Sequence, residues 1–252
     1  MATTLVINLG SSSKKYALYE EQRLVLELRF EKTGAGYEAC SHLSGTQQVC
    51  ESVTEEQFDK AFTQVVEEVS QYLLRELAGK QLDVVVVRIV SPGTFFQRHV
   101  QVDTDFLKKL QKRESVAPLY IPSVIREIKQ VQKYFSSAKI IAASDSAFHS
   151  EMPPRAREYS INREDVNTFD LHRFGYHGLS VSSVVRRIHA LIGQDPERMV
   201  VCHVGNSISV TAVKNGKSVE STMGFSPYSG LPMGSRAGDL DSAALLELMR
   251  AK

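Results

Sequence analysis

Four consecutive valines at positions 84–87 constrain the fold of this chain more than any other feature. A continuous run of β-branched residues is typical of a strand buried on both faces of a helix-covered sheet. A helical pattern precedes it, because apolar residues recur at three- and four-residue steps over 55–77. Two further helices are indicated after it, beginning near Asp103 and near Pro122. Strands that alternate with helices in this way predict an α/β domain.

The segments VINLG and VCHVG share a second pattern. Each has a polar residue two places before a glycine, followed by a small polar turn and a returning strand. The glycines are Gly10 and Gly205, and the pair indicates either a duplicated domain or a chance similarity. The Asn215-Gly216 dipeptide between two later strand-like runs predicts a hairpin. We expect one domain over residues 1–149 and a second over residues 150–252.

The composition limits the classes of protein that fit. Of 252 residues, 42% are hydrophobic and 23% charged, as in ordinary globular proteins. The formal charge of +1 lacks the basic excess of a nucleic-acid-binding surface. We find no apolar stretch long enough for a membrane span and no export signal. The 3 cysteines lack the spacing of a disulfide framework or a zinc site, so we expect reduced thiols in a cytoplasmic protein.

Three features at the ends of predicted strands each allow a functional and a structural interpretation. The serine-rich turn after Gly10 either cradles an anion with backbone N–H groups or forms a hairpin tip. Arg88 interrupts an apolar strand, so its guanidinium either meets a carboxylate of the protein or binds an anionic ligand. Asp145 follows the predicted strand 139–143. It either binds a ligand, because α/β sheets place ligand-binding groups at strand ends, or caps the next helix.

Two later segments have the composition of a site. His177 lies between Gly175 and Gly178, which leave the imidazole accessible for catalysis or for a structural hydrogen bond. The segment 223–241 combines glycines with Arg236 and two aspartates in a long loop. Loops of this kind are more often functional than merely connecting.

Five segments together resemble the successive signature segments of the acetate kinase family. In chain order they are VINLGSSSKKYAL, SDSAFHSEMP, RFGYHGLS, VCHVGNSISVTAVKNGKSVESTMGF and GLPMGSRAGDLD. This family belongs to the sugar kinase, Hsp70 and actin superfamily. The resemblance therefore implies an α/β, ribonuclease-H-like (actin-like ATPase) fold that is duplicated. Family members continue well beyond the last segment, so the second domain is expected to be incomplete.

The resemblance also implies a reaction, the transfer of a phosphoryl group between ATP and a short-chain carboxylate such as acetate or propionate, with Mg²⁺. By similarity, Arg88 and Arg236 bracket the carboxylate and the phosphoryl group. His177 hydrogen-bonds the phosphoryl group in the transition state, and Asp145 acts near the metal or orients the nucleophile. Such an enzyme is expected to be a cytoplasmic homodimer without nucleic-acid or membrane partners.

Further binding residues follow from the same resemblance. Asn8 matches the magnesium position. The residues that match the ATP phosphate segments are Ser11, Ser13, Lys15, His203, Gly205 and Asn206. The residues that match the apolar pocket for the acyl group are Val90, Leu119, Tyr176 and Pro227.

The chain departs from the family pattern at several of these places. It has Ser91-Pro92-Gly93 where the family has a His-Gly-Gly turn, and Tyr120 and Val181 where the family has histidines. The Gly-Asn-Gly turn becomes Gly205-Asn206-Ser207, which adds a Cβ where a phosphate approaches the backbone. Tyr176 replaces a phenylalanine and adds a hydroxyl. These departures leave an alternative open, in which a catalytically impaired family member acts as a binding or scaffold protein.

Overall fold

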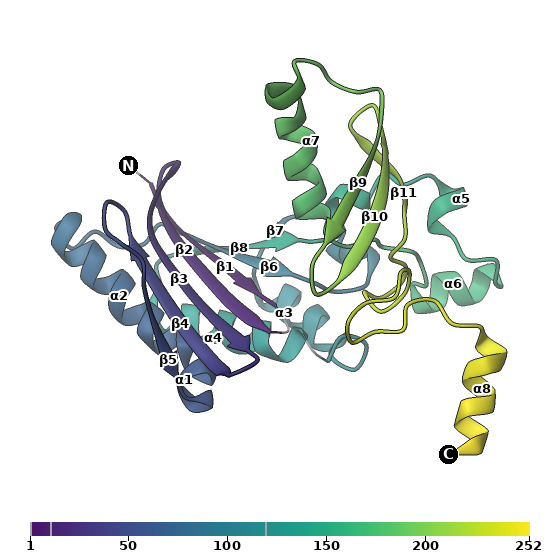
Figure 1. Cartoon of the computed structure of the whole chain (residues 1–252), viewed down its shortest axis with the longest axis horizontal. Helices are drawn as coiled ribbons and strands as arrows, with labels where there is room; N and C mark the ends of the chain where they lie inside the picture. The colour runs from purple at the N-terminus through teal and green to yellow at the C-terminus, as the bar shows by residue number, and fades with distance from the viewer. Residues whose placement is uncertain (1, 11, 119) are drawn as a thin grey trace. The chain divides into compact units, whose positions relative to one another are not determined.

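The computed structural model describes residues 2–10, 12–118 and 120–252. The chain forms two compact units (Figure 1). Unit 1 comprises Met1–Ile89 and His99–Ala143, and unit 2 comprises Val90–Arg98 and Ser144–Lys252. Ser11 and Leu119, to which the sequence assigns roles, lie outside the described residues.

Unit 1 is built on an eight-stranded sheet with the order β5-β4-β3-β2-β1-β6-β8-β7. Its strands are β1 (Thr3–Leu9), β2 (Ser13–Glu20), β3 (Arg23–Thr33), β4 (Gly36–Leu43), β5 (Val49–Val53), β6 (Val84–Ile89), β7 (Val100–Gln101) and β8 (Lys139–Ser144). The first five strands form an antiparallel meander, and β1 pairs in parallel with β6. The sheet is therefore mixed, as in an α/β protein.

In its described residues this unit has the helices α1 (Glu55–Asp59), α2 (Ala61–Glu76), α3 (Thr104–Gln111) and α4 (Ile121–Tyr134). The single helix predicted over 55–77 is two helices that meet at Lys60, the residue that ends α1 and precedes α2. The predicted start near Asp103 is confirmed, because its side chain accepts a hydrogen bond from the Phe106 N–H at 2.7 Å.

The core of unit 1 lies where α2 and α4 pack on the sheet, α2 on β2 and β3 and α4 on β6. The ring centroids of Tyr16 and Phe62 are 6.1 Å apart across this contact. Val85 and Val87 are fully buried, whereas Val84 and Val86 are only partly buried. The prediction of a strand buried on both faces is thus right for one face and wrong for the other, where the alternate side chains keep some exposure.

A buried carboxyl group lies inside this core. Glu127 of α4 is 5% exposed, and its carboxylate accepts a short hydrogen bond from the Tyr16 hydroxyl. Burial raises the pKa of Glu127, and the hydrogen bond from Tyr16 and the positive charges of Lys14 and Arg126 partly offset this rise. Because the folded-state pKa is raised, this group's contribution to stability is greatest at low pH and is lost as pH rises through that value.

We expect Tyr16→Phe to lower the free energy of unfolding by about 1–3 kcal/mol at pH 7, because a buried carboxylate loses its hydrogen-bond donor. The loss should be smaller near pH 5, where the folded protein retains more of the proton on Glu127. Urea denaturation at the two pH values measures both quantities.

The matched control is Tyr37→Phe, whose hydroxyl donates to Glu55 at 2.7 Å on the surface. We expect this change to stay within about 0.5 kcal/mol at both pH values. Equal losses of unfolding free energy in the two variants would show that the buried hydrogen bond between Tyr16 and Glu127 stabilises the fold no more than a surface one.

The prediction of three reduced thiols is wrong for two of them, because Cys40 and Cys50 form a disulfide. The register of β4 and β5 places these residues directly opposite each other, with a Cα–Cα distance of 4.1 Å. A sequence separation of 10 residues does not reveal this pairing, which depends on the hairpin register. Cys202 is free and exposed.

Unit 2 contains a three-stranded antiparallel sheet in the order β11-β10-β9. Its strands are β9 (Arg198–Val204), β10 (Ile208–Lys214) and β11 (Lys217–Ser221), and its α-helices are α5 (Pro154–Arg157), α6 (Arg163–Phe169), α7 (Gly178–Ile192) and α8 (Ser242–Ala251). Two 3₁₀ turns, η1 (Thr94–Phe96) and η2 (Ala147–His149), complete it. No helix in the described parts of the chain is long and apolar enough to span a membrane.

The two glycine turns have the same place in their sheets. Gly10 lies in the turn between the antiparallel strands β1 and β2, and Gly205 lies in the turn between the antiparallel strands β9 and β10. The predicted hairpin at Asn215-Gly216 is confirmed, with positive φ at both residues between β10 and β11. The shared strand–turn–strand plan supports duplication over a chance similarity.

Candidate functional site

The backbone around His177 is held in an uncommon conformation by Asp145. His177 precedes α7 with φ of 59°, in the left-handed region that non-glycine residues seldom adopt. Its N–H donates to the Asp145 carboxylate at 2.9 Å, and the Gly178 N–H donates to the Asp145 carbonyl at 2.8 Å. A Cβ on Gly178 would lie 2.6 Å from that carbonyl oxygen, so this close approach requires glycine.

The imidazole of His177 lies between two serine hydroxyls of the adjacent sheet. Its Nδ1 is 2.8 Å from Ser209 Oγ and its Nε2 is 2.9 Å from Ser207 Oγ. The ring stacks on His203 with a centroid distance of 3.9 Å, and His203 Nδ1 is 3.0 Å from Ser180 Oγ. Asp145, His177 and His203 are thus brought together, and the hydroxyls fix the orientation of both rings.

A second histidine braces the loop that carries His177. His149 is fully buried, and burial lowers its pKa, which favours the neutral ring. Its Nε2–H donates to the Tyr176 carbonyl at 2.9 Å, which leaves Nδ1 to accept the Ser218 hydroxyl at 2.8 Å. Gly175 has φ of +61°, and a Cβ there would lie 2.6 Å from the ring. The loop is therefore shaped around His149.

Arg236 lies in the long loop predicted to form part of the site. Its Nη1 donates to the Pro227 carbonyl at 3.0 Å, and its guanidinium lies 5.3 Å from the centroid of the Tyr228 ring. The loop is closed by a pair of 2.8 Å hydrogen bonds between Gly230 and Asp239. These contacts give an otherwise irregular segment a defined conformation.

The polar residues Asn8, Lys15 and Arg88 lie at neighbouring positions on three adjacent strands of unit 1. The β1–β2 register pairs Asn8 with Lys15, and Arg88 directly follows Val87, which pairs with Ile7 in the β1–β6 register. The Arg88 Nη1 donates to Asn8 Oδ1 at 3.1 Å, and Lys15 pairs with Glu31 at 3.3 Å. Of the two interpretations of Arg88, a partner within the protein is thus present, and the Asn8 amide is one such partner.

The remaining predicted binding residues fall into two groups. Val90, Tyr176 and Pro227, expected around the acyl group, are all buried in unit 2. The Tyr176 hydroxyl donates to the Phe225 carbonyl at 2.6 Å. Gly205 and Asn206 lie in the turn between β9 and β10, where the Gly205 N–H donates to the Ser207 carbonyl at 3.1 Å. In unit 1, Ser13 begins β2, and its carbonyl accepts the Gly10 N–H at 2.8 Å.

Three of the positions that depart from the family pattern have defined places in the fold. Val181 is fully buried and packs with Val201 and Val213 in the core of unit 2. Tyr120 is 8% exposed and immediately precedes α4. Pro92 precedes Gly93, which has φ of 125° and lies immediately before η1.

The sequence analysis missed His149, Ser209 and Ser180. A signal for Ser209 was present, since polar Ser209 and Thr211 alternate with apolar residues in the strand and are both fully buried. A buried polar face opposite a candidate histidine indicates hydrogen-bond partners. His149 lies inside a quoted segment, but nothing in the sequence indicates its contact with residue 176.

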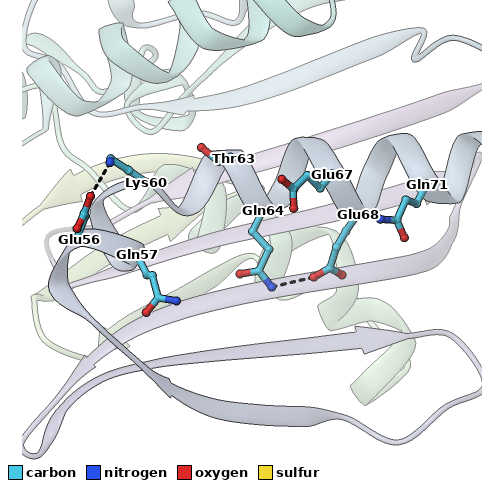
Figure 2. A pocket seen from close by; sticks show the side chains of 8 residues that line it. All are labelled: Glu56, Gln57, Lys60, Thr63, Gln64, Glu67, Glu68 and Gln71. Carbon is cyan, nitrogen blue, oxygen red and sulfur yellow. Dashed lines mark hydrogen bonds and ion pairs between the residues drawn. The ribbon is translucent and has the colours of Figure 1, made fainter.

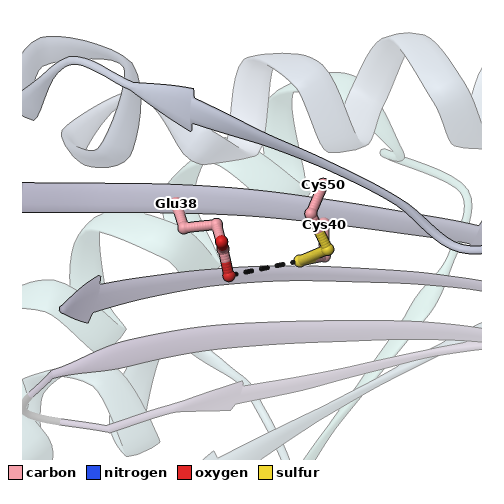
Figure 3. Close-up of side chains that lie close together, drawn as sticks. All are labelled: Glu38, Cys40 and Cys50. Atoms are coloured by element: carbon pink, nitrogen blue, oxygen red, sulfur yellow. Dashed lines mark hydrogen bonds between the residues drawn. A yellow bond between two sulfur atoms is a disulfide. The ribbon is translucent and has the colours of Figure 1, made fainter.

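Other clusters lie away from these residues. Among the described residues, the potential metal-ligand atoms of Glu38, Cys40 and Cys50 lie within 4.8 Å of one another (Figure 3), but the two sulfurs are bonded to each other. The Cys40 Sγ lies 3.5 Å from the Glu38 carboxylate. A polar groove of about 490 Å³ runs along α1 and α2 (Figure 2), and none of the described site residues lines it.

Known proteins resemble the chain along nearly its whole length. The acetate kinase of Clostridium acetobutylicum is 35% identical over 97% of this chain and 62% of its own length. That of Caldanaerobacter subterraneus subsp. tengcongensis is 34% identical, with 97% and 63% covered. The crystal structure of a propionate kinase from Francisella tularensis has a TM-score of 0.83 and 27% identity, covering 99% of this chain and 64% of its own. The chain thus spans somewhat less than two thirds of these relatives' length.

Fold and comparisons together define the class of the protein as one with the sugar kinase and actin-like ATPase fold. The family profile described as the Acetokinase family matches residues 3–252. The chain therefore belongs to the acetokinase family, as the sequence resemblance predicted.

Proposed function

We propose that the chain transfers a phosphoryl group between ATP and a short-chain carboxylate, acetate or propionate. The observation that carries this proposal is the His177 site, where a buried aspartate fixes the backbone and two hydroxyls fix the ring. Membership of a family whose relatives are named acetate kinase supports it.

The reaction requires charge neutralisation and positioning, because a carboxylate and a phosphoryl group repel each other. We assign this neutralisation to Arg88 and Arg236. His177 donates a hydrogen bond to the phosphoryl group, most strongly in the transition state. Fixed donors of this kind act without reorganising during the reaction.

The nucleotide phosphates are assigned to the turn that contains Gly205 and Asn206, with His203 beside it. A Cβ on Gly205 would meet only one atom within 4 Å, at 3.9 Å, so the turn leaves room for a ligand. Mg²⁺ prefers oxygen ligands and commonly uses one or two carboxylates with substrate phosphates. The Asp145 carboxylate and the Asn8 amide oxygen fit that preference, and the ion would neutralise phosphate charge.

The acid is assigned to the pocket expected from Val90, Tyr176 and Pro227. An apolar pocket separates acids that differ by one methylene by only about 1–3 kcal/mol. Acetate and propionate are therefore both proposed as substrates. A homodimer in the cytoplasm, without nucleic-acid or membrane partners, completes the proposal, and the Cys40–Cys50 disulfide is then exposed to a reducing environment.

We expect Arg236→Lys to lower kcat/KM by about tenfold, equivalent to about 1.4 kcal/mol. Lysine keeps the charge but loses the planar fork that binds a carboxylate or phosphate through two hydrogen bonds. The measurement is ATP formation from ADP and acetyl phosphate. Arg250→Lys, on exposed α8, is the matched control and should keep its full rate. A full rate in Arg236→Lys would reject the assignment of this arginine.

A second candidate is a family member that binds its ligands without turnover. The observation that favours it is that Tyr120 and Val181 stand where the resemblance predicts histidines, and Pro92 where it predicts a glycine turn. This candidate requires a folded protein whose melting temperature rises with Mg-ATP while no acyl phosphate forms. Turnover by the purified chain rejects it.

A further inference from the structure

Ser207, His177 and Ser209 form an arrangement in which the proposed kinase reaction leaves the Ser207 hydroxyl without a chemical role. Ser207 Oγ is 2.9 Å from His177 Nε2, and Ser209 Oγ is 2.8 Å from Nδ1 on the other side of the ring. A hydroxyl within hydrogen-bond reach of a base, with a third group that orients the base, is the structural signature of an activated nucleophile.

The three residues differ in exposure as this interpretation requires. Ser209 is fully buried and His177 is 6% exposed, so the orienting group and the base are shielded from water. Ser207 is half-buried and lies in the turn between β9 and β10, where a ligand can reach it. The hydrogen bond from the His177 N–H to Asp145 and the stacking on His203 keep the base in place.

We propose that Ser207 accepts a phosphoryl group from an acyl phosphate and becomes phosphoserine. This inference rests on the proposed function, because that function supplies the acyl phosphate at this site. It depends on a departure from the family pattern, since the resemblance predicts glycine at position 207.

The transfer to Ser207 needs no reactant other than the acyl phosphate. Ser207 Oγ attacks the phosphorus, a P–O bond forms to the serine, and the P–O bond to the acyl group breaks as the carboxylate leaves. In the tautomer with the proton on Nδ1, which donates to Ser209, the lone pair of Nε2 accepts the serine proton.

The orienting group also sets the expected rate. Ser209 is neutral, whereas the orienting group of an efficient serine nucleophile is usually a carboxylate that stabilises the imidazolium. We therefore expect slow labelling that stops at one phosphoryl group per chain. The reaction is a self-modification rather than a turnover cycle.

The test incubates the purified chain with acetyl phosphate and Mg²⁺, follows its intact mass, and maps the modified peptide. We expect a mass gain of one phosphoryl group, located at Ser207. Ser207→Ala should lose the label, and His177→Asn should slow labelling by about 10²-fold. Ser209→Ala should slow it by about tenfold, as expected for loss of the orienting group. Ser182→Ala, near the start of α7, is the control and should label like the parent.

Three outcomes would overturn the proposal in protein whose melting curve shows that it is folded. They are the absence of a label, a label on another residue, and the gain of an acetyl group, which would place the attack at carbon. Hydroxamate formation with Mg-ATP and acetate is measured on the same sample. Hydroxamate without phosphoserine rejects this inference alone, and phosphoserine without hydroxamate rejects only the kinase proposal.

Discussion

His177→Asn is expected to lower the rate of acyl phosphate formation by about 10²–10³-fold, the usual effect of removing one fixed transition-state hydrogen bond. Asparagine is the suitable replacement, because it tolerates the left-handed backbone of this residue, whose φ is 59°. The shorter side chain does not extend to the position of Nε2 beside Ser207. Steady-state rates with Mg-ATP and acetate measure the effect.

His189→Asn is the matched control for this change. His189 lies on the same helix, but it is exposed near the C-terminal end and pairs with Asp195 at 3.0 Å. Its replacement should leave the rate unchanged. If His177→Asn retained a rate within about twofold of the parent, the role given to the imidazole in transition-state binding would be wrong.

Gly175→Ala is expected to lower the free energy of unfolding by about 3 kcal/mol, combining the cost of a left-handed alanine with that of overpacking. The residue has φ of +61°, and its new Cβ would lie 2.6 Å from the ring of buried His149. The His149 ring cannot move away without losing its hydrogen bonds to Tyr176 and Ser218. The variant should therefore lose activity together with stability.

Gly193→Ala separates the two causes of this loss. Gly193 ends α7 with φ of +74°, but a Cβ there would meet no heavy atom within 4 Å. We expect a loss of about 1–2 kcal/mol from backbone strain alone. Urea denaturation of both variants gives the difference, and equal losses would show that the contact with His149 has no energetic importance.

The elements that the sequence predicted are those set by local pattern. The valine run over 84–87 is a strand, and Asn215-Gly216 forms the turn of a hairpin, because each depends on residues next to one another. Asp103 begins a helix for the same reason. The break at Lys60 escaped prediction, since the apolar spacing of the two helices continues across it.

What escaped prediction depends on register between segments distant in sequence. Cys40 and Cys50 face each other only because β4 and β5 pair in one register. Ser207 and Ser209 contact His177 only once the sheet and α7 have packed together. The same holds for His149 and Ser218, which are 69 positions apart. Residue types suggested His177 as a site residue, whereas its partners required the fold.

The proposed function requires this chain to phosphorylate a short-chain acid at its His177 site. The most direct measurement mixes the purified protein with Mg-ATP and acetate, and traps acyl phosphate as its hydroxamate. We expect hydroxamate to accumulate in proportion to time and protein, from acetate and from propionate. A folded protein that forms no hydroxamate from either acid would show that the chain is not such a kinase.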